Sequence, residues 1–234
     1  MSRARTALVI RGGWDGHKPV EATELFLPFL EEQDFEVRVE ELDDLSAYAD
    51  ADVMAGTDLV LQCVTMSTIT DEQVAGLRAA IRAGTGFAGW HGGIADSFRS
   101  SADYLQLVGG QFAAHPAKPA DQCTGDQADS FLPHTVSIRP EAADHPIVAG
   151  VGDFSLETEQ YWVLSDGYND VLATTTHPAR EDQPWSREVT CPAVWTRSWG
   201  SGRVFVATPG HSLDVLESVP VRTIVERGLL WASR

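Results

Sequence analysis

The chain has 234 residues, 43% of them hydrophobic and 22% charged, enough to bury a sizeable core in one large domain or two small ones. Its 34 acidic against 17 basic residues give a net charge of -17, which argues against a nucleic-acid or anionic-membrane partner because both need a positive surface. No apolar run is long enough for a signal-peptide core or a membrane span, and the three cysteines form no CxxC pattern, so we expect a cytoplasmic protein without disulfides.

The first half of the sequence alternates between strand and helix patterns. Apolar runs predict strands at 7–10, 35–39, 59–63 and 86–89, and helical spacing predicts helices at 21–33 and from 70 towards 84. Thr70 and Gln73 have the spacing of a capping box at the start of the second helix. The order strand–helix–strand–strand–helix–strand predicts a mostly parallel sheet covered on both faces.

The second half is richer in strands. Strands are predicted at 135–139, 154–158, 171–175, 193–195 and 204–207, with a hairpin turn at 199–203 and a last helix at 221–231. Two long irregular stretches, 113–133 and 177–192, have the composition of loops that carry or cover a site. Because the sheet is expected to continue through both halves, we predict one domain over residues 1–234.

The segment 86–93, GFAGWHGG, is the most informative part of the chain. It predicts a sharp turn from a buried strand into a helix, with glycines where a β-carbon is forbidden. Nucleophile elbows have this geometry and carry Ser or Cys at the apex. Here the apex residue is His91. An active site at this turn is therefore neither a serine nor a thiol site.

Other histidines follow the ends of predicted strands. The carboxyl ends of the strands of an open α/β sheet are where ligands bind, so polar residues there are expected to converge. Neutral imidazoles brought together by separate loops suit a divalent metal such as Zn or Mn, or acid–base chemistry near pH 7. Each histidine alone is better explained as a structural turn residue, and only the set favours a functional cluster. Neither an HExxH pair nor a nucleotide-binding motif is present. His17, His91 and His211 follow predicted strand ends, and His115 shares with them a position beside glycine or proline in a turn.

Carboxylates and aromatic residues accompany these histidines. Glu157 and Glu159 fall on one face of a predicted strand, and Glu159 lies beside aromatic side chains that can raise a carboxyl pKa towards that of a general base. The alternative is a solvated strand face. Tryptophan rings pack on the C–H faces of sugars, so these acids and histidines together indicate a carbohydrate ligand. The candidate substrate-binding residues are Trp14, Asp15, Trp90, Asp96 and Tyr161.

Several motifs resemble the trehalose-utilisation (ThuA-like) family. They are the segments 89–93 with 96–98, 108–112, 115–116, 144–147, 157–161, 200–206 and 210–211, which follow the family's order over nearly the whole chain. The resemblance implies a flavodoxin-like, class I glutamine amidotransferase-like three-layer sandwich, with His91 in place of the amidotransferase cysteine. The family has an acidic pair before the tyrosine, whereas Thr158 precedes Glu159 here, so only Glu159 carries over.

These observations predict a cytoplasmic enzyme that acts on trehalose, a related disaccharide or a keto-sugar, as a hydrolase, lyase or isomerase and not as a glutamine amidotransferase. His91, Glu159 and His115 are the candidate catalytic residues, and His17, His115 and His211 the candidate metal ligands. The alternative is a non-catalytic sugar-binding or regulatory protein on the same scaffold. Exposed aromatics and long loops are also compatible with a homodimer.

Overall fold

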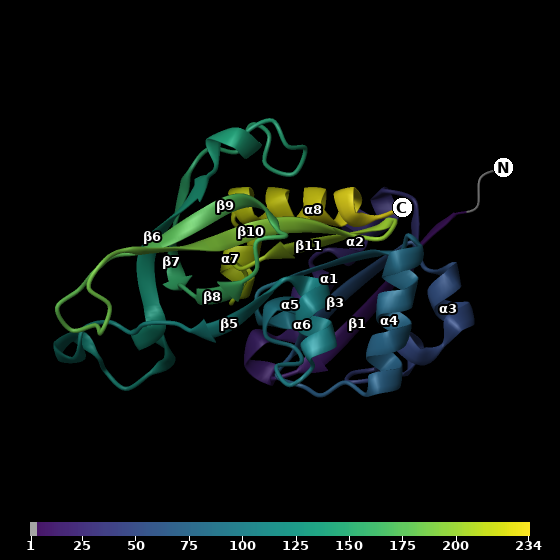
Figure 1. Ribbon diagram of the computed structural model, residues 1–234, viewed down its shortest axis with the longest axis horizontal. Coiled ribbons are helices and arrows are strands. Elements are labelled where there is room, and N and C mark those ends of the chain that lie inside the picture. Colours follow the sequence, from purple (N-terminus) through teal and green to yellow (C-terminus); the bar gives the residue numbers. More distant parts are fainter. Residues whose placement is uncertain (1–3) are drawn as a thin grey trace.

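A nine-stranded sheet passes through both halves of the chain in the computed structural model, which describes residues 4–234. Its first five strands are parallel and follow the spatial order β2 (Phe35–Val39), β1 (Arg5–Gly13), β3 (Leu59–Thr65), β4 (Gly86–Trp90) and β11 (Gly202–Ala207). The sheet continues through the antiparallel strands β10 (Val189–Trp199), β9 (Asp170–His177), β6 (Phe131–Ile138) and β7 (Phe154–Glu159). Figure 1 shows these antiparallel strands extending away from the helix-covered part of the sheet.

Alternate residues of β1 face two separate hydrophobic cores. Ala7 and Val9 pack into one core, and Leu8 and Ile10 pack into the other. Both faces of the strand are buried, which explains its continuous apolar run. One core is covered by α1 (Pro19–Glu24), α2 (Leu27–Glu32), α7 (Leu213–Glu217) and α8 (Val219–Ala232). The other is covered by α3 (Ala51–Gly56), α4 (Asp71–Ala83), α5 (Gly92–Ala95) and α6 (Ala102–Val108).

This arrangement confirms the predicted α/β sandwich with helices on both faces, and also the capping box of α4. The predicted helix over 21–33 is instead divided into α1 and α2. Pro28 lies in the first turn of α2, where its missing N–H costs nothing, whereas inside a longer helix it would break a hydrogen bond.

The prediction that the strand at 35–39 is followed by the strand at 59–63 with no helix between them is wrong. Helix α3 lies between β2 and β3. It is only six residues long and buries a single apolar side chain, Met54, so it has almost no periodic pattern. Its start is marked by Asp50, whose carboxylate accepts hydrogen bonds from the backbone of Asp52 and Val53. A small second sheet, β5 (Gly110–Ala114) with β8 (Trp162–Ser165), was also not predicted.

A buried polar network supports the turn after β4. The amide nitrogen of Gln62 donates to the Gly93 carbonyl at 3.2 Å and to Ser97 Oγ at 2.9 Å. Tyr48 donates to Gln62 Oε1 at 2.8 Å, and Tyr104 donates to the Ile94 carbonyl at 2.8 Å. Because buried polar groups are costly when unpaired, this network fixes the short helix α5 against β3.

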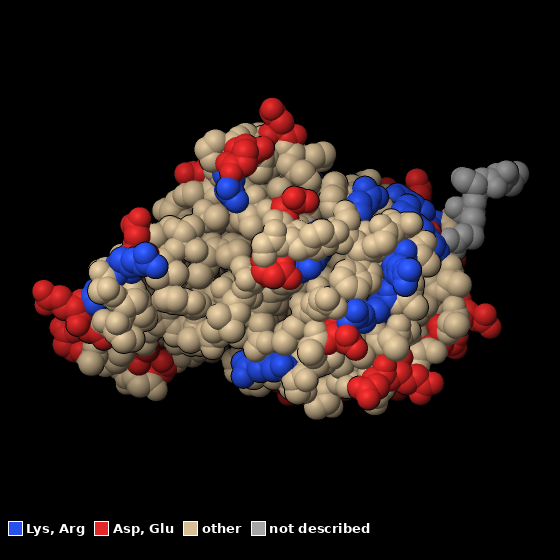
Figure 2. Space-filling model, in the orientation of Figure 1, with Lys and Arg blue, Asp and Glu red and all other residues tan. Residues whose placement is uncertain are grey.

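Figure 2 shows basic side chains gathered on the right-hand part of the face in view and acidic side chains mainly at its left end and along its edges. No helix among residues 4–234 is long and apolar enough to cross a membrane.

Candidate metal centre and its cavity

His91 occupies the apex of a strand–turn–helix elbow. It follows β4, precedes α5, and has φ 49° and ψ -144°, a conformation that non-glycine residues rarely adopt. Its Nδ1–H donates to the Thr208 carbonyl at 2.8 Å. A carbonyl can only accept, so this bond places the proton on Nδ1 and leaves a lone pair on Nε2. Burial lowers the pKa of His91, which favours this neutral form.

His17 reaches the same place from the turn after β1. Its Nδ1 lies 2.9 Å from Thr65 Oγ1, and its buried Nε2 has no hydrogen-bond partner among the described residues. The ring packs directly against Gly92, where a β-carbon would lie 2.7 Å from Cε1 of His17. Burial, followed by the charges of His91 and His211, lowers the pKa of His17 to about 3. His17 is therefore a neutral imidazole with one unengaged nitrogen.

His211 and Glu159 complete the cluster from opposite parts of the sheet. His211 follows β11, and Glu159 ends β7. His211 Nδ1 lies 3.0 Å from Glu159 Oε2, and its Nε2 lies 2.8 Å from the side-chain amide of Gln127. Tyr161 donates its hydroxyl to the same carboxylate oxygen at 2.8 Å. Burial alone would raise the pKa of Glu159, but the hydrogen bond from His211 and the proximity of His91 outweigh it, so the pKa is lowered and the carboxylate is ionised.

The four side chains fit a divalent metal. One nitrogen or oxygen atom from each of His17, His91, Glu159 and His211 lies within 4.8 Å of the other three. Oε2 of Glu159 lies 3.0 Å from Nδ1 of His211 and 3.4 Å from Nε2 of His91. These two nitrogens lie 3.3 Å from each other. Ligands bound at about 2.0 Å around a tetrahedral metal lie roughly 3.3 Å apart, so this spacing matches a coordination shell.

The outer nitrogens of the three histidines provide a second argument. Each is held by a protein group: His91 by the Thr208 carbonyl, His17 by Thr65 and His211 by Gln127. Metal-binding histidines almost always donate their outer N–H to such a partner, which fixes the tautomer and the direction of the ring. The Thr208 carbonyl and the Thr65 hydroxyl can accept this hydrogen bond, whereas Gln127 must turn its amide oxygen, rather than its nitrogen, towards His211 for Nδ1 of His211 to offer a lone pair.

A cavity of about 320 Å³ opens beside this cluster. That volume is at the lower end of the range for small-molecule sites. A second cavity of about 250 Å³ is lined by His17, His211 and Gln127 among others. The first cavity is lined by Trp14, His17, Met66, Asp96, Arg99, Phe112, Ala113, Ala114, His115, Glu159 and Tyr161.

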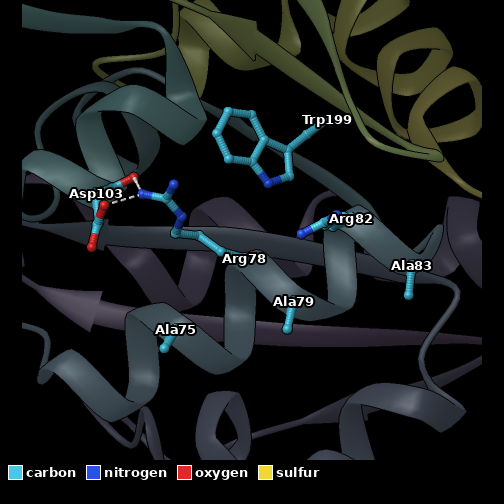
Figure 3. A pocket seen from close by; sticks show the side chains of 7 residues that line it. All are labelled: Ala75, Arg78, Ala79, Arg82, Ala83, Asp103 and Trp199. Carbon is cyan, nitrogen blue, oxygen red and sulfur yellow. Dashed lines mark hydrogen bonds and ion pairs between the residues drawn. The ribbon is translucent and has the colours of Figure 1, made fainter.

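A larger cavity, about 650 Å³, lies elsewhere, between α4, the start of α6 and Trp199. In Figure 3, Arg78 reaches across it to Asp103, and three alanines form its floor along α4. This cavity contains no histidine, and its one carboxylate is already paired with Arg78, so it offers no comparable chemistry.

Residues 6–232 match the family model ThuA, described as trehalose utilisation. The chain belongs to the ThuA family. A ThuA-like protein from Bacteroides uniformis has a TM-score of 0.72 at 16% identity, over 99% of this chain and 93% of that one. A ThuA-like protein from Parabacteroides merdae has a TM-score of 0.72 at 17% identity, over 98% of this chain and 90% of that one. A protein from Salmonella typhimurium described as cytoplasmic has a TM-score of 0.64 at 11% identity, over 98% of this chain and 100% of that one. The search of curated proteins finds no match.

These likenesses confirm the amidotransferase-like fold class of this ThuA family member. Its elbow carries no thiol. Cys63 lies under the elbow against Gly93, and burial raises the pKa of that thiol to about 12. It is therefore neither exposed nor ionised as an amidotransferase nucleophile must be.

The structure brings together most of the residues singled out in the sequence. Glu157 is exposed, whereas Glu159 is buried in the cluster. His115 does not belong to the four-residue group; its Nε2 lies 3.8 Å from Glu159 Oε1, on the cavity wall. Trp14, Asp96 and Tyr161 also line the cavity.

Two predicted substrate-binding residues lie elsewhere. Trp90 is 2% exposed and packs on Phe26 in the core, with ring centroids 4.8 Å apart, because alternation along β4 turns it away from the cavity. Asp15 is exposed but is not among the cavity-lining residues. Sequence reasoning did not assign Gln127 or Arg99 to the site. Both come from irregular segments in which no periodic pattern indicates where a side chain points.

Proposed function

We propose that this ThuA family member is a metal-dependent enzyme that acts on a sugar derivative. The observation that carries the proposal is the spacing of the four ligand atoms of His17, His91, Glu159 and His211, together with the unpartnered Nε2 of His17. The family description, trehalose utilisation, points to a carbohydrate as substrate. The adjacent cavity has room for one sugar unit.

Three imidazoles and one carboxylate suit Zn or Mn. Such an ion, when bound, polarises a carbonyl or hydroxyl oxygen of a ligand and lowers the pKa of a bound water. These properties serve hydrolysis, elimination and isomerisation alike. The protein's contribution is to hold the four ligands in neutral-imidazole and carboxylate form, which the pKa directions of His17, His91 and Glu159 favour.

In this proposal His115, rather than His91 or Glu159, is the side chain that accepts and donates the proton. A ligand's lone pair is engaged by the metal and is not available as a base. His115 lines the cavity, its Nδ1 has no hydrogen-bond partner among the described residues, and its Nε2 makes only the 3.8 Å contact with Glu159. An imidazole with two unengaged nitrogens beside a substrate cavity is suited to accept a proton from the substrate and return it.

The first experiment is the metal content of protein purified without a chelator or a histidine tag. We expect about one Zn or Mn per chain in the wild type, and its loss in His91→Ala and His211→Ala. His145→Ala is the matched control, because His145 lies outside the cluster and bonds only to its own turn, accepting from Ile147. Wild-type protein that holds no metal and acquires none on dialysis against either ion would contradict the proposal.

Activity is then tested with the metal-loaded protein on disaccharides and keto-sugars. We expect turnover to fall at least 100-fold in His115→Ala while metal content is retained, because general acid–base groups contribute factors of about this size. A His115→Ala protein with full turnover would remove His115 from the chemistry and leave the metal assignment intact.

A further inference from the structure

The cavity wall carries an ion pair outside the metal-ligand group. Arg99 donates from Nε to Oδ1 of Asp96 and from Nη2 to Oδ2, each at 2.6 Å. Two parallel bonds of this kind fix both partners in one orientation. Asp96 is 5% exposed, whereas the Arg99 side chain is 55% exposed. The pair therefore has a buried acceptor and a donor that reaches the mouth of the cavity.

This pair retains hydrogen-bonding capacity for a ligand. Among the described residues no partner is found for Nη1 of Arg99, which carries two hydrogens. The carboxylate oxygens of Asp96 accept only from Arg99 and can each accept once more. Arg99 can thus donate a hydrogen bond to a ligand, and Asp96 beside it can accept one. Since the two charges balance, the pair suits neutral hydroxyl groups better than a second anion.

The backbone around Asp96 is fixed to the neighbouring loop. Met66 N–H donates to the Asp96 carbonyl at 2.9 Å, and Ser67 N–H donates to the Ser97 carbonyl at 2.8 Å. Met66 has φ 51°, an uncommon conformation for a residue with a side chain. Strained positions of this kind cluster at ligand sites, where the surrounding contacts maintain them. The ion pair is therefore held in place before a ligand arrives.

Two apolar side chains stand exposed at the same mouth. Trp14 is 42% exposed and Met66 is 47% exposed, although both line the cavity. Trp14 is fixed by an edge contact with His17, with ring centroids 4.7 Å apart. A large apolar surface left exposed beside paired polar groups matches the two sides of a sugar ring, which has C–H groups on its faces and hydroxyls at its edge.

We propose that Arg99 and Asp96 form the specificity-determining pair of the cavity and bind two adjacent hydroxyl groups of a neutral sugar ring. Arg99 donates to the oxygen of one hydroxyl, Asp96 accepts from its neighbour, and a C–H face of the ring lies on Trp14. The proposal rests on the function proposed above and deepens it, because it states which part of the substrate is recognised.

The test is calorimetric titration with methyl α-D-glucopyranoside and its 2-deoxy, 3-deoxy and 4-deoxy derivatives. The glucoside is chosen because the family description names trehalose, a glucose disaccharide. We expect the wild type to bind the parent sugar about 10- to 100-fold more tightly than at least one deoxy derivative, the factor for one hydrogen bond to a charged group.

Arg99→Lys is the informative variant, because it keeps the charge beside Asp96 but loses the planar fork. We expect it to bind the parent sugar as weakly as that deoxy derivative. A purely structural effect would instead weaken the binding of all four sugars equally. Arg78→Ala is the control, because Arg78 forms a similar ion pair with Asp103 in the cavity of Figure 3. The Arg78→Ala protein is expected to bind all four sugars as the wild type does.

The proposal is overturned if Arg99→Lys retains the discrimination, or if the wild type binds no member of the panel. Metal analysis of the same samples separates this outcome from the function itself. Protein with bound metal but no Arg99-dependent discrimination contradicts only the specificity pair. Protein without metal that still discriminates through Arg99 contradicts the metal-dependent function and supports the pair.

Discussion

His91 Nε2 and His211 Nδ1 face each other across 3.3 Å at the centre of the cluster. Because the proton of His91 is on Nδ1, bonded to Thr208, its Nε2 presents a lone pair towards His211. The carboxylate of Glu159 approaches both nitrogens. Two imidazole nitrogens and a carboxylate directed at one point are stabilised by a cation placed there, and each member loses a partner when another is removed.

Metal binding is expected to stabilise the fold, since the four side chains that would hold the ion come from distant parts of the chain. At free Zn²⁺ of 100 times its dissociation constant, the free energy of unfolding should rise by about 2.7 kcal/mol. The measurement is urea denaturation of chelator-treated protein with and without added ZnCl₂. His211→Ala should show no rise, whereas His145→Ala should behave as the wild type. An equal rise in His211→Ala would exclude the cluster as the binding site.

The hydroxyl of Thr65 is expected to set metal affinity without binding the metal. It lies 2.9 Å from His17 Nδ1 and orients the ring. Thr65→Val keeps the shape but removes this partner, and loss of such an outer contact typically weakens metal binding 10- to 100-fold. Competition with a chromophoric chelator measures the change.

Thr85→Val provides the matched control. Thr85 is also 1% exposed, and its hydroxyl donates to the Thr57 carbonyl at 3.0 Å, outside the cluster. Both substitutions should lower stability by a similar amount, but only Thr65→Val should change metal affinity. Unchanged affinity in Thr65→Val would mean that packing alone orients His17.

The parallel half of the fold follows from the sequence because its strands are buried on both faces and its turns carry glycine and proline. The paired glycines also predict the elbow at His91, but for a different reason from the one expected. The positive φ belongs to His91, and the glycines are required for close packing, because a β-carbon at Gly92 would lie 2.7 Å from His17 and one at Gly93 2.8 Å from Cys63. The antiparallel half is harder to predict. Strands β5 and β8 pair only with each other, and their short segments contain no pattern that selects this partner.

The site was partly predictable from the rule that polar residues after parallel strands converge. This rule found His17, His91 and His211, which follow β1, β4 and β11. Glu159 was found through its aromatic neighbours, although it ends an antiparallel strand. The separation of His115 from the ligands could not be predicted, because it depends on where β5 leaves the sheet. Gln127 could not be predicted either, since it approaches His211 from an irregular loop.

Acid should destabilise the metal-free protein through His17. Its pKa falls from 6.5 to about 3 on folding, so between these values the unfolded chain binds more protons than the folded one. Stability is therefore lost as the pH falls from 6.5 towards 3, by about 1.4 kcal/mol per pH unit from this residue, and is unaffected by it above 6.5. Urea denaturation in chelator at pH 7, 5 and 4 measures the slope.

His17→Gln should reduce that slope by the amount that His17 contributes. Glu159 adds a loss of stability at lower pH, because the contribution of its lowered pKa is complete above the ordinary value of 4.5 and is lost progressively as the pH falls below it. The hydrogen bond from His211 and the proximity of His91 lower the pKa of Glu159, and both remain in the variant. Equal slopes for wild type and His17→Gln between pH 6.5 and 5 would show that His17 is protonated normally in the folded protein.

The close packing of His17 on the elbow predicts that Gly92→Ala is more damaging to the site than to the fold. The added methyl group would lie 2.7 Å from Cε1 and 3.0 Å from Nδ1 of His17 and 3.0 Å from Cγ2 of Thr65, so the contact between these two side chains must shift. We expect metal affinity to fall at least 10-fold, as for loss of an outer contact, with a cooperative unfolding transition retained. Gly167→Ala is the control, because its methyl group would meet no atom within 4 Å. Wild-type affinity in Gly92→Ala would show that the ring position of His17 does not determine metal binding.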